Sequence, residues 1–234
     1  MVSAIIIVSI AFLLLVWFIY EKSKKYDLKE LFIKTAISVL FILLALITTY
    51  NSGTFTIFNV LVITGLVFGL LGDILLDLKA IDLERTKGYT YAGFITFGLG
   101  HILFITALIM KYYKGEVLYI ILAIITDIVI SAITILMEKP LKLKYGKMKP
   151  TVLLYALCLF GTVSFSLFLA IENGFQYQTL TMFFIGAVLF AASDLILSGT
   201  YFGEGKERPV DFVLNYVFYY GAQFTIAFSL LFLV

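Results

Sequence analysis

Long apolar runs separated by short polar links make up this chain from end to end. A helix needs about 20 apolar residues to cross roughly 30 Å of hydrocarbon. Eight segments meet that length, and the links between them are too short to hold a folded domain. The pattern predicts an all-α polytopic membrane protein with one transmembrane domain, residues 1–234. The predicted helices are Val2–Tyr20, Leu31–Tyr50, Thr56–Leu78, Tyr91–Met110, Glu116–Met137, Thr151–Ile171, Thr179–Thr200 and Asp211–Leu233.

The composition agrees with this pattern. Hydrophobic residues make up 62% of the chain and charged residues 14%, against roughly 25% charged in a soluble domain. Neither a soluble domain nor a nucleic-acid-binding module is expected. The single cysteine, Cys158, excludes an intrachain disulfide and is expected to pack as a small apolar residue. The first apolar run lacks a basic segment before it and a small-residue cleavage site after it, so we expect a retained helix.

The basic residues are distributed unevenly between the links. Of the 17 Lys and Arg residues, all but Lys111 and Lys114 lie in or beside the odd-numbered links. Because positively charged loops stay in the cytoplasm, we expect both termini outside a bacterial-type plasma membrane. Topology is the default role of these residues, and those of the third and seventh links could also meet a phosphate headgroup. In order, the basic residues of the odd-numbered links are Lys22, Lys24, Lys25, Lys29 and Lys34; Lys79, Arg85 and Lys87; Lys139, Lys142, Lys144, Lys147 and Lys149; and Lys206 and Arg208.

Two aspartates fall inside predicted helices, where a carboxylate is costly unless it is paired, protonated or in a polar cavity. Asp73 and Asp194 lie about 8 and 9 Å from the cytoplasmic ends of the third and seventh helices. A small residue precedes each of them, Gly72 and Ser193. We expect the two carboxyls to face one site as a general acid and its partnering base. Helix capping or a hydrogen bond to a neighbouring helix is the simpler alternative.

The two aspartates are 121 positions apart, and other residues match at the same offset. Gly53 meets Gly174, and Gly65 meets Gly186. The lysine-rich first link also falls on the lysine-rich fifth link. This offset predicts two parallel four-helix repeats with a site near their shared axis, although leucine and isoleucine matches are uninformative in so apolar a chain.

Three further titratable residues lie in or beside apolar runs. Asp77, one turn after Asp73, is interpreted as a solvated residue at the mouth of the site. Asp127 is interpreted as a structural or supporting residue, with a tyrosine or His101 as candidate partners. His101 is a candidate acid, base or orienting donor, or else a satisfied buried histidine. One histidine and one distant cysteine do not make a zinc site, and no metal or other cofactor is expected.

A polar cluster interrupts the last helix at Tyr219-Tyr-Gly-Ala-Gln223. Tyr219 and Gln223 are four residues apart and therefore share a helix face. Together with Tyr220, they are candidate donors that line a substrate cavity. Hydrogen bonding between helices is the alternative.

Four of these stretches, taken in order, carry a resemblance to a known family, the YhhN-like membrane proteins or lysoplasmalogenases. Their order and spacing are similar to that family from the third helix to the last. Gly221 departs from it, because many relatives have alanine there. The stretches are Gly65-Leu-Val-Phe-Gly-Leu-Leu-Gly-Asp73, Phe97-Gly-Leu-Gly-His101, Gly186-Ala-Val-Leu-Phe-Ala-Ala-Ser-Asp194 and Tyr219-Tyr-Gly-Ala-Gln223.

The resemblance implies a hydrolase that cleaves the vinyl-ether bond of a lysoplasmalogen into a fatty aldehyde and a glycerophospho-ethanolamine or -choline. It implies that Asp73 and Asp194 are catalytic, and that substrate is bound by His101, Ser193, Tyr219, Tyr220 and Gln223. The expected partners are a lysophospholipid substrate and membrane lipids. The site is expected to open toward the cytoplasmic half.

Vinyl-ether hydrolysis needs a carboxylic acid to protonate carbon and a carboxylate to stabilise the cation and activate water, like the carboxyl pair of a glycosidase. The two aspartates suit this chemistry. Two alternatives stay open. A transporter or flippase also uses intramembrane carboxylates and repeats. A lipid hydrolase resembling the alkaline ceramidases would need several histidines for zinc, and this chain has one.

Overall fold

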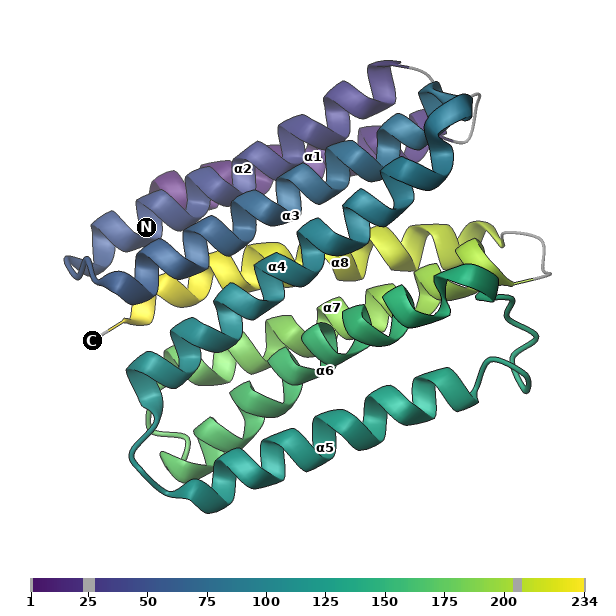
Figure 1. Ribbon diagram of the computed structural model, residues 1–234. Coiled ribbons are helices and arrows are strands. Elements are labelled where there is room, and N and C mark those ends of the chain that lie inside the picture. Colours follow the sequence, from purple (N-terminus) through teal and green to yellow (C-terminus); the bar gives the residue numbers. More distant parts are fainter. Residues whose placement is uncertain (1, 23–27, 204–207, 234) are drawn as a thin grey trace.

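The computed structural model is a bundle of α-helices that run alternately up and down, and it describes residues 2–22, 28–203 and 208–233 (Figure 1). The eight predicted helices are all present in these ranges, where no strand occurs. Several helices extend beyond the predicted apolar runs because polar residues at a membrane interface continue the helix. The helices are α1 Val2–Lys22, α2 Leu28–Ser52, α3 Ile57–Ile81, α4 Thr86–Tyr112, α5 Val117–Leu136, α6 Lys149–Glu172, α7 Gln178–Phe202 and α8 Pro209–Ser229, with short 3-10 turns at Leu83–Arg85, Gly146–Met148 and Leu230–Phe232.

Seven of these helices, α1 to α7, are long and apolar enough to cross a membrane. The chain is therefore an integral membrane protein. Helix α8 is long enough but less apolar, because Asn215, Tyr219, Tyr220 and Gln223 interrupt it. It packs against α2 and α7, so these polar side chains lie inside the bundle.

The two halves of the chain have the same pattern of helix packing. Helices α1, α2, α3 and α4 each pack on the next, and so do α5, α6, α7 and α8. The halves meet where α4 packs on α6 and where α8 packs on α2. The 121-residue offset relates α4 to α8 and α2 to α6, so these two contacts are equivalent. This is the arrangement that two parallel four-helix repeats require.

Glycines mark matched positions in the two halves. Gly53 and Gly174 follow α2 and α6 with φ of +68° and +60°, the left-handed conformation that favours glycine. Gly65 and Gly186 lie where α3 meets α4 and α7 meets α8. A Cβ atom on Gly186 would lie 3.2 Å from the carbonyl oxygen of Ala222, so the small residue allows the helices to approach closely.

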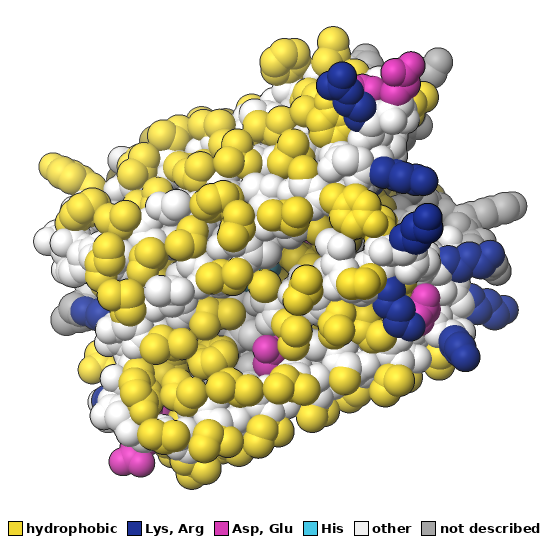
Figure 2. Space-filling model, in the orientation of Figure 1, with side chains coloured by type: hydrophobic (Ala, Val, Ile, Leu, Met, Phe, Trp, Pro, Cys, Tyr) yellow, Lys and Arg dark blue, Asp and Glu magenta, His cyan; other side chains and the backbone are white. Residues whose placement is uncertain are grey.

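Charged side chains gather at the ends of the bundle, and apolar side chains cover most of its length (Figure 2). Most of the lysine and arginine side chains in this view lie at the end of the bundle at which α1, α3, α5 and α7 terminate (Figures 1 and 2). Both termini lie at the opposite end (Figure 1). Lys24, Lys25 and Lys206, which contributed to the predicted orientation, are outside the described residues.

Candidate functional site

A cavity with about 520 Å³ of space free of protein atoms, part of it open to the surroundings, lies between the two halves. Helices α2, α3 and α4 line it from the first half, and α6, α7 and α8 from the second. Its lining residues are Lys34, Asp73, Leu76, Phe94, Phe97, Tyr155, Ser193, Asp194, Leu197, Tyr201, Asn215, Tyr216 and Tyr219. Both predicted catalytic aspartates are among them.

The lining is arranged in matched pairs from the two halves. Asp73 and Asp194 stand at the 121-residue offset, and so do Leu76 and Leu197. The same offset relates Lys34 to Tyr155 and Phe94 to Asn215. The cavity therefore lies between the two halves of the chain and is lined by residues that this offset relates.

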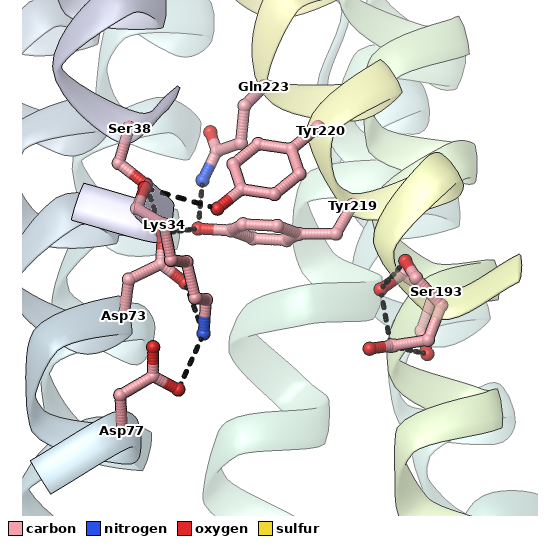
Figure 3. Close-up of polar contacts among 9 residues, drawn as sticks. Lys34, Ser38, Asp73, Asp77, Ser193, Tyr219, Tyr220 and Gln223 are labelled. Carbon is pink, nitrogen blue, oxygen red and sulfur yellow. Dashed lines mark hydrogen bonds and ion pairs between the residues drawn. The ribbon is translucent and has the colours of Figure 1, made fainter. Parts of the chain in front are cut away.

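Asp73 is buried in the most polar part of the cavity, where α2, α3 and α8 meet (Figure 3). The hydroxyls of Ser38 and Tyr219 donate to its Oδ2 atom at 2.6 and 2.7 Å. The Lys34 ammonium lies 3.3 Å from Asp73 Oδ1 and 3.0 Å from Asp77 Oδ1. Lys34 thus bridges two carboxylates, and Asp73 has three donors from two other helices.

Two interpretations of the sequence are wrong at this point. Lys34 was assigned to the first link as a topological charge, and Asp77 to a solvated mouth. Lys34 is 5% exposed and Asp77 is 6% exposed, since each is the other's ion-pair partner inside the bundle. Lys34 lies on the second turn of α2, where its stem reaches inward to α3. Its spacing of four residues from Ser38 was the signal that it shares an inner helix face.

Asp194 has a simpler environment than Asp73. Its carboxylate accepts a hydrogen bond from the Tyr155 hydroxyl, which comes from α6. Asp194 is partly exposed, whereas Asp73 is buried, and both line the same cavity. Tyr155 was missed in the sequence because tyrosine is common in apolar helices. Its offset of 121 from Lys34 was a signal only once Lys34 had been recognised.

Ser193 lines the cavity, but its polar atoms are already paired with α8. Its hydroxyl donates to the carbonyl oxygen of Asn215, and the Asn215 amide donates to the Ser193 carbonyl and hydroxyl oxygens at 2.9 Å each. Figure 3 shows this pair apart from the Asp73 network. Ser193 thus ties α7 to α8 beside Asp194.

The tyrosine and glutamine residues of α8 support Asp73 from behind. The Gln223 amide donates to the Tyr219 hydroxyl at 3.0 Å, which in turn donates to Asp73 (Figure 3). Tyr220 donates to the carbonyl oxygen of Lys34 at 3.3 Å. Tyr219 lines the cavity, whereas Tyr220 and Gln223 lie behind it. A substrate contact by these last two residues stays a prediction.

His101 and Asp127 lie away from the cavity lining. The Nδ1 atom of His101 is 3.0 Å from the Thr162 hydroxyl, and its ring packs edge-on against Phe190. Asp127 accepts a hydrogen bond from Ser131 at 3.2 Å. The expected pairing of Asp127 with His101 or a tyrosine is therefore wrong, because Asp127 faces α6 and bonds to its own helix. A substrate contact by His101 stays a prediction.

The arrangement can move protons at a bound molecule. Two carboxyls line one cavity, and their donors differ in number and charge. Such a difference pushes two carboxyls toward different protonation states, which is what a general acid and its partner need. Within the described ranges, no group of three or more His, Cys, Asp or Glu side chains gathers as a metal site.

Comparison with known proteins gives one match. No curated protein and no solved structure matches this sequence. The model of the YhhN family matches residues 29–230, which include all the residues that line the cavity. This match spans most of the chain, and the resemblance carried by its four motifs is confirmed. The chain belongs to the YhhN family.

Proposed function

We propose that this protein hydrolyses the vinyl-ether bond of lysoplasmalogens. The observation that carries the proposal is the pair of carboxyls, Asp73 and Asp194, in one intramembrane cavity with unequal hydrogen-bond donors. Membership of the YhhN family is consistent with a hydrolase. A single-chain lipid also suits a cavity that lies inside a membrane bundle and carries a buried lysine.

In this proposal Asp73 is the carboxylate. A nearby ammonium and two donated hydroxyl hydrogen bonds all favour the ionised form of a carboxyl group. Asp73 would stabilise the cation that forms on the substrate and accept a proton from the attacking water. Lys34, Ser38 and Tyr219 are positioning residues in this scheme, because they act through Asp73.

Asp194 is the proton donor. Among the described contacts, the only hydrogen bond donated to the Asp194 carboxyl comes from the neutral Tyr155 hydroxyl, and none of these contacts is an ion pair with a cation. It is also the more accessible of the two carboxyls. A carboxylic acid with these properties is the better source of the proton that a vinyl ether must receive on carbon.

The proposed steps balance without another reagent. Asp194 protonates the carbon farther from the ether oxygen, and the C=C π electrons form the new C–H bond and leave an oxocarbenium ion. Water adds to the cationic carbon and gives a proton to Asp73. Asp194 then takes the hemiacetal hydroxyl proton while Asp73 protonates the departing glyceryl oxygen. The C–O bond breaks to give aldehyde and alcohol, and both carboxyls return to their starting states.

We place the mouth of the cavity at the end of the bundle with the basic links, which the distribution of lysine and arginine predicts to be cytoplasmic. Lys34 is about 9 Å from the start of α2 at that end. A phosphate headgroup would stay near this basic end, and the substrate would enter from the inner leaflet of a bacterial-type plasma membrane.

The test is aldehyde release from lysoplasmalogen by purified protein in detergent. Asp73→Asn and Asp194→Asn should each lower the rate by about 10²- to 10⁴-fold, the range for a lost acid–base group. Asp127→Asn is the matched control, since that half-buried carboxyl lies outside the cavity, and it should keep the wild-type rate.

Full activity in either cavity variant would overturn the mechanism. Wild-type protein that binds lysoplasmalogen but releases no aldehyde would instead favour a lipid carrier. Comparison with the acyl analogue of the substrate shows whether the vinyl ether is the bond that is cleaved.

A further inference from the structure

A second cavity lies beside the first and is lined mainly by apolar side chains. It has about 490 Å³ of space free of protein atoms, part of it open to the surroundings, and is bounded by α4, α5, α6 and α7 together with Tyr145. Val152, Ala156, Leu159 and Phe160 form its α6 wall at helical spacing, so they share one face. This wall extends over about 12 Å of the helix.

The second cavity adjoins the first and shares lining residues with it. Phe94, Tyr155, Asp194, Leu197 and Tyr201 line both of them. Asp194 therefore stands at the junction of a polar cavity and an apolar one. Lys34 and Asp73 belong to the polar cavity alone.

The apolar cavity also reaches the lipid-facing surface. Its α7 wall includes Leu195, which is 51% exposed, and the α5 wall includes Thr134. Helix α5 lies at the edge of the bundle and packs against α6 (Figure 1). The rings of Tyr145 and Phe202, which both line the cavity, pack edge-on with their centroids 5.0 Å apart.

We infer that the apolar cavity binds the single hydrocarbon chain of a lysolipid. The chain would run from Asp194 along the α6 wall toward Leu159 and Phe160, and leave into the bilayer beside Leu195. The phosphate headgroup would occupy the polar cavity near Lys34. This inference rests on the proposed function for the identity of the reacting bond, but chain binding itself does not depend on catalysis.

Asp194 lies where the reacting bond of such a substrate would be placed. In a lysoplasmalogen, the vinyl ether lies where the glycerol part ends and the hydrocarbon chain begins. A molecule with its chain in the apolar cavity and its headgroup in the polar cavity would place that bond at the junction. Ala156 then decides how much room the chain has, because it is the small residue in the middle of the α6 wall.

The test combines a binding measurement with a chain-length series. A lysophosphatidylethanolamine with a photoreactive diazirine on its acyl chain is irradiated with purified wild-type protein, and the labelled residues are mapped by mass spectrometry. Labelling should concentrate on the cavity segments Thr134–Leu136, Val152–Phe160 and Leu195–Ser198. Competition by unlabelled long-chain lysolipid should reduce it.

Ala156→Leu fills the cavity and should reduce this labelling and lower aldehyde release from long-chain lysoplasmalogen by about tenfold or more. Release from a short-chain substrate should change less. Ala132→Leu is the matched control, because it adds the same side chain to the lipid-facing surface of α5, and it should leave both substrates unaffected.

The outcomes separate this inference from the proposed function. Labelling at the cavity without aldehyde release would support the chain site and overturn the hydrolase. Aldehyde release with labelling confined to other helices would overturn the chain site alone. The chain site would also be overturned if Ala156→Leu lost aldehyde release equally on short-chain and long-chain substrates while its cavity was labelled as strongly as in the wild type.

Discussion

The two halves of the bundle place different chemistry at equivalent positions. In the first half, Lys34 on α2 forms an ion pair with Asp73 on α3. In the second half, Tyr155 on α6 donates a hydrogen bond to Asp194 on α7. Both residues of the second pair stand 121 positions after those of the first. A common framework thus holds one carboxyl beside a cation and the other beside a neutral hydroxyl.

The same offset explains why Asp194 has fewer donors. The position equivalent to Ser38 holds Leu159, and the position equivalent to Tyr219 holds Gly98. Leu159 instead lines the apolar cavity. The first half therefore places two hydroxyl donors at its carboxyl, and the second half places a leucine in the wall of the apolar cavity. Two carboxyls at equivalent positions thus have different environments because their neighbours differ.

The largest expected effect comes from removing the cation of the first pair. Lys34→Met leaves Asp73 and Asp77 facing each other inside the bundle without a positive charge. Breaking a buried ion pair on one side costs about 3–5 kcal/mol of folding free energy. Thermal unfolding in detergent should show a large loss of stability for this variant.

Lys29→Met is the matched control for that experiment. Lys29 pairs with Glu21 on the surface with half of its side chain exposed, and such pairs contribute at most about 1 kcal/mol. Similar losses for the two lysine variants would contradict the contrast between a buried bridge and a surface charge.

The fold could be predicted from the sequence because hydrophobic length is a direct signal. Seven of the eight helices are apolar enough to recognise from composition, and the offset of Asp73 from Asp194 indicated the symmetric arrangement. Helix ends were predicted less well. Helix α4 begins at Thr86 rather than Tyr91, because its first turns lie outside the apolar run.

The carboxyls of the site could be predicted, but their partners could not. Asp73 and Asp194 are conspicuous because charge is rare in an apolar helix. Lys34 was taken for one of many loop lysines, and Tyr155 for an ordinary tyrosine, because a helix sequence alone does not say which face points inward. The separate apolar cavity depends on how α5, α6 and α7 pack, which no local pattern encodes.

The two halves also differ in how closely equivalent glycines pack against the neighbouring helix. A Cβ atom on Gly100 would lie 2.9 Å from the carbonyl oxygen of Gly65, which cannot move without shifting α3. At the equivalent Gly221, the nearest atom would be Leu189 Cδ1 at 3.8 Å. Gly100→Ala should therefore destabilise the protein by about 1–3 kcal/mol.

Gly221→Ala should be neutral or stabilising by up to about 1 kcal/mol, since alanine favours helix more than glycine does. Unfolding of the two variants under identical conditions is the measurement. Equal destabilisation would show that the halves pack alike at these positions, against the geometry described above.

Tyr155→Phe is a milder change in the second pair. It removes one hydroxyl hydrogen bond to Asp194 and keeps the ring, at a cost of about 1 kcal/mol in unfolding free energy. Aldehyde release should survive at a reduced rate, because Asp194 keeps its carboxyl but loses the contact that orients it. A stability loss as large as that of Lys34→Met would mean that the hydroxyl is as important to folding as the cation.

The smallest effect is expected at the link between the first two helices of each half. Each link carries a glutamate–lysine pair, Glu21 with Lys29 and Glu138 with Lys149. The hydrogen bond from Lys149 holds the pKa of the Glu138 carboxyl below its usual range. A lowered folded-state pKa contributes stability above the unfolded-state pKa, and this contribution disappears as the pH falls through the folded-state value.

Glu138→Gln should therefore unfold at a slightly lower temperature than wild type at neutral pH, and the difference should shrink to nothing in acid. The gap at neutral pH should be smaller than that of Tyr155→Phe, because exposed charges are screened by solvent. Lys149→Met should reproduce the neutral-pH shift if the ion pair is its cause. A neutral-pH shift that Lys149→Met did not reproduce would instead assign it to the other contact of Glu138, in which the carboxylate accepts from the backbone nitrogen of Tyr145.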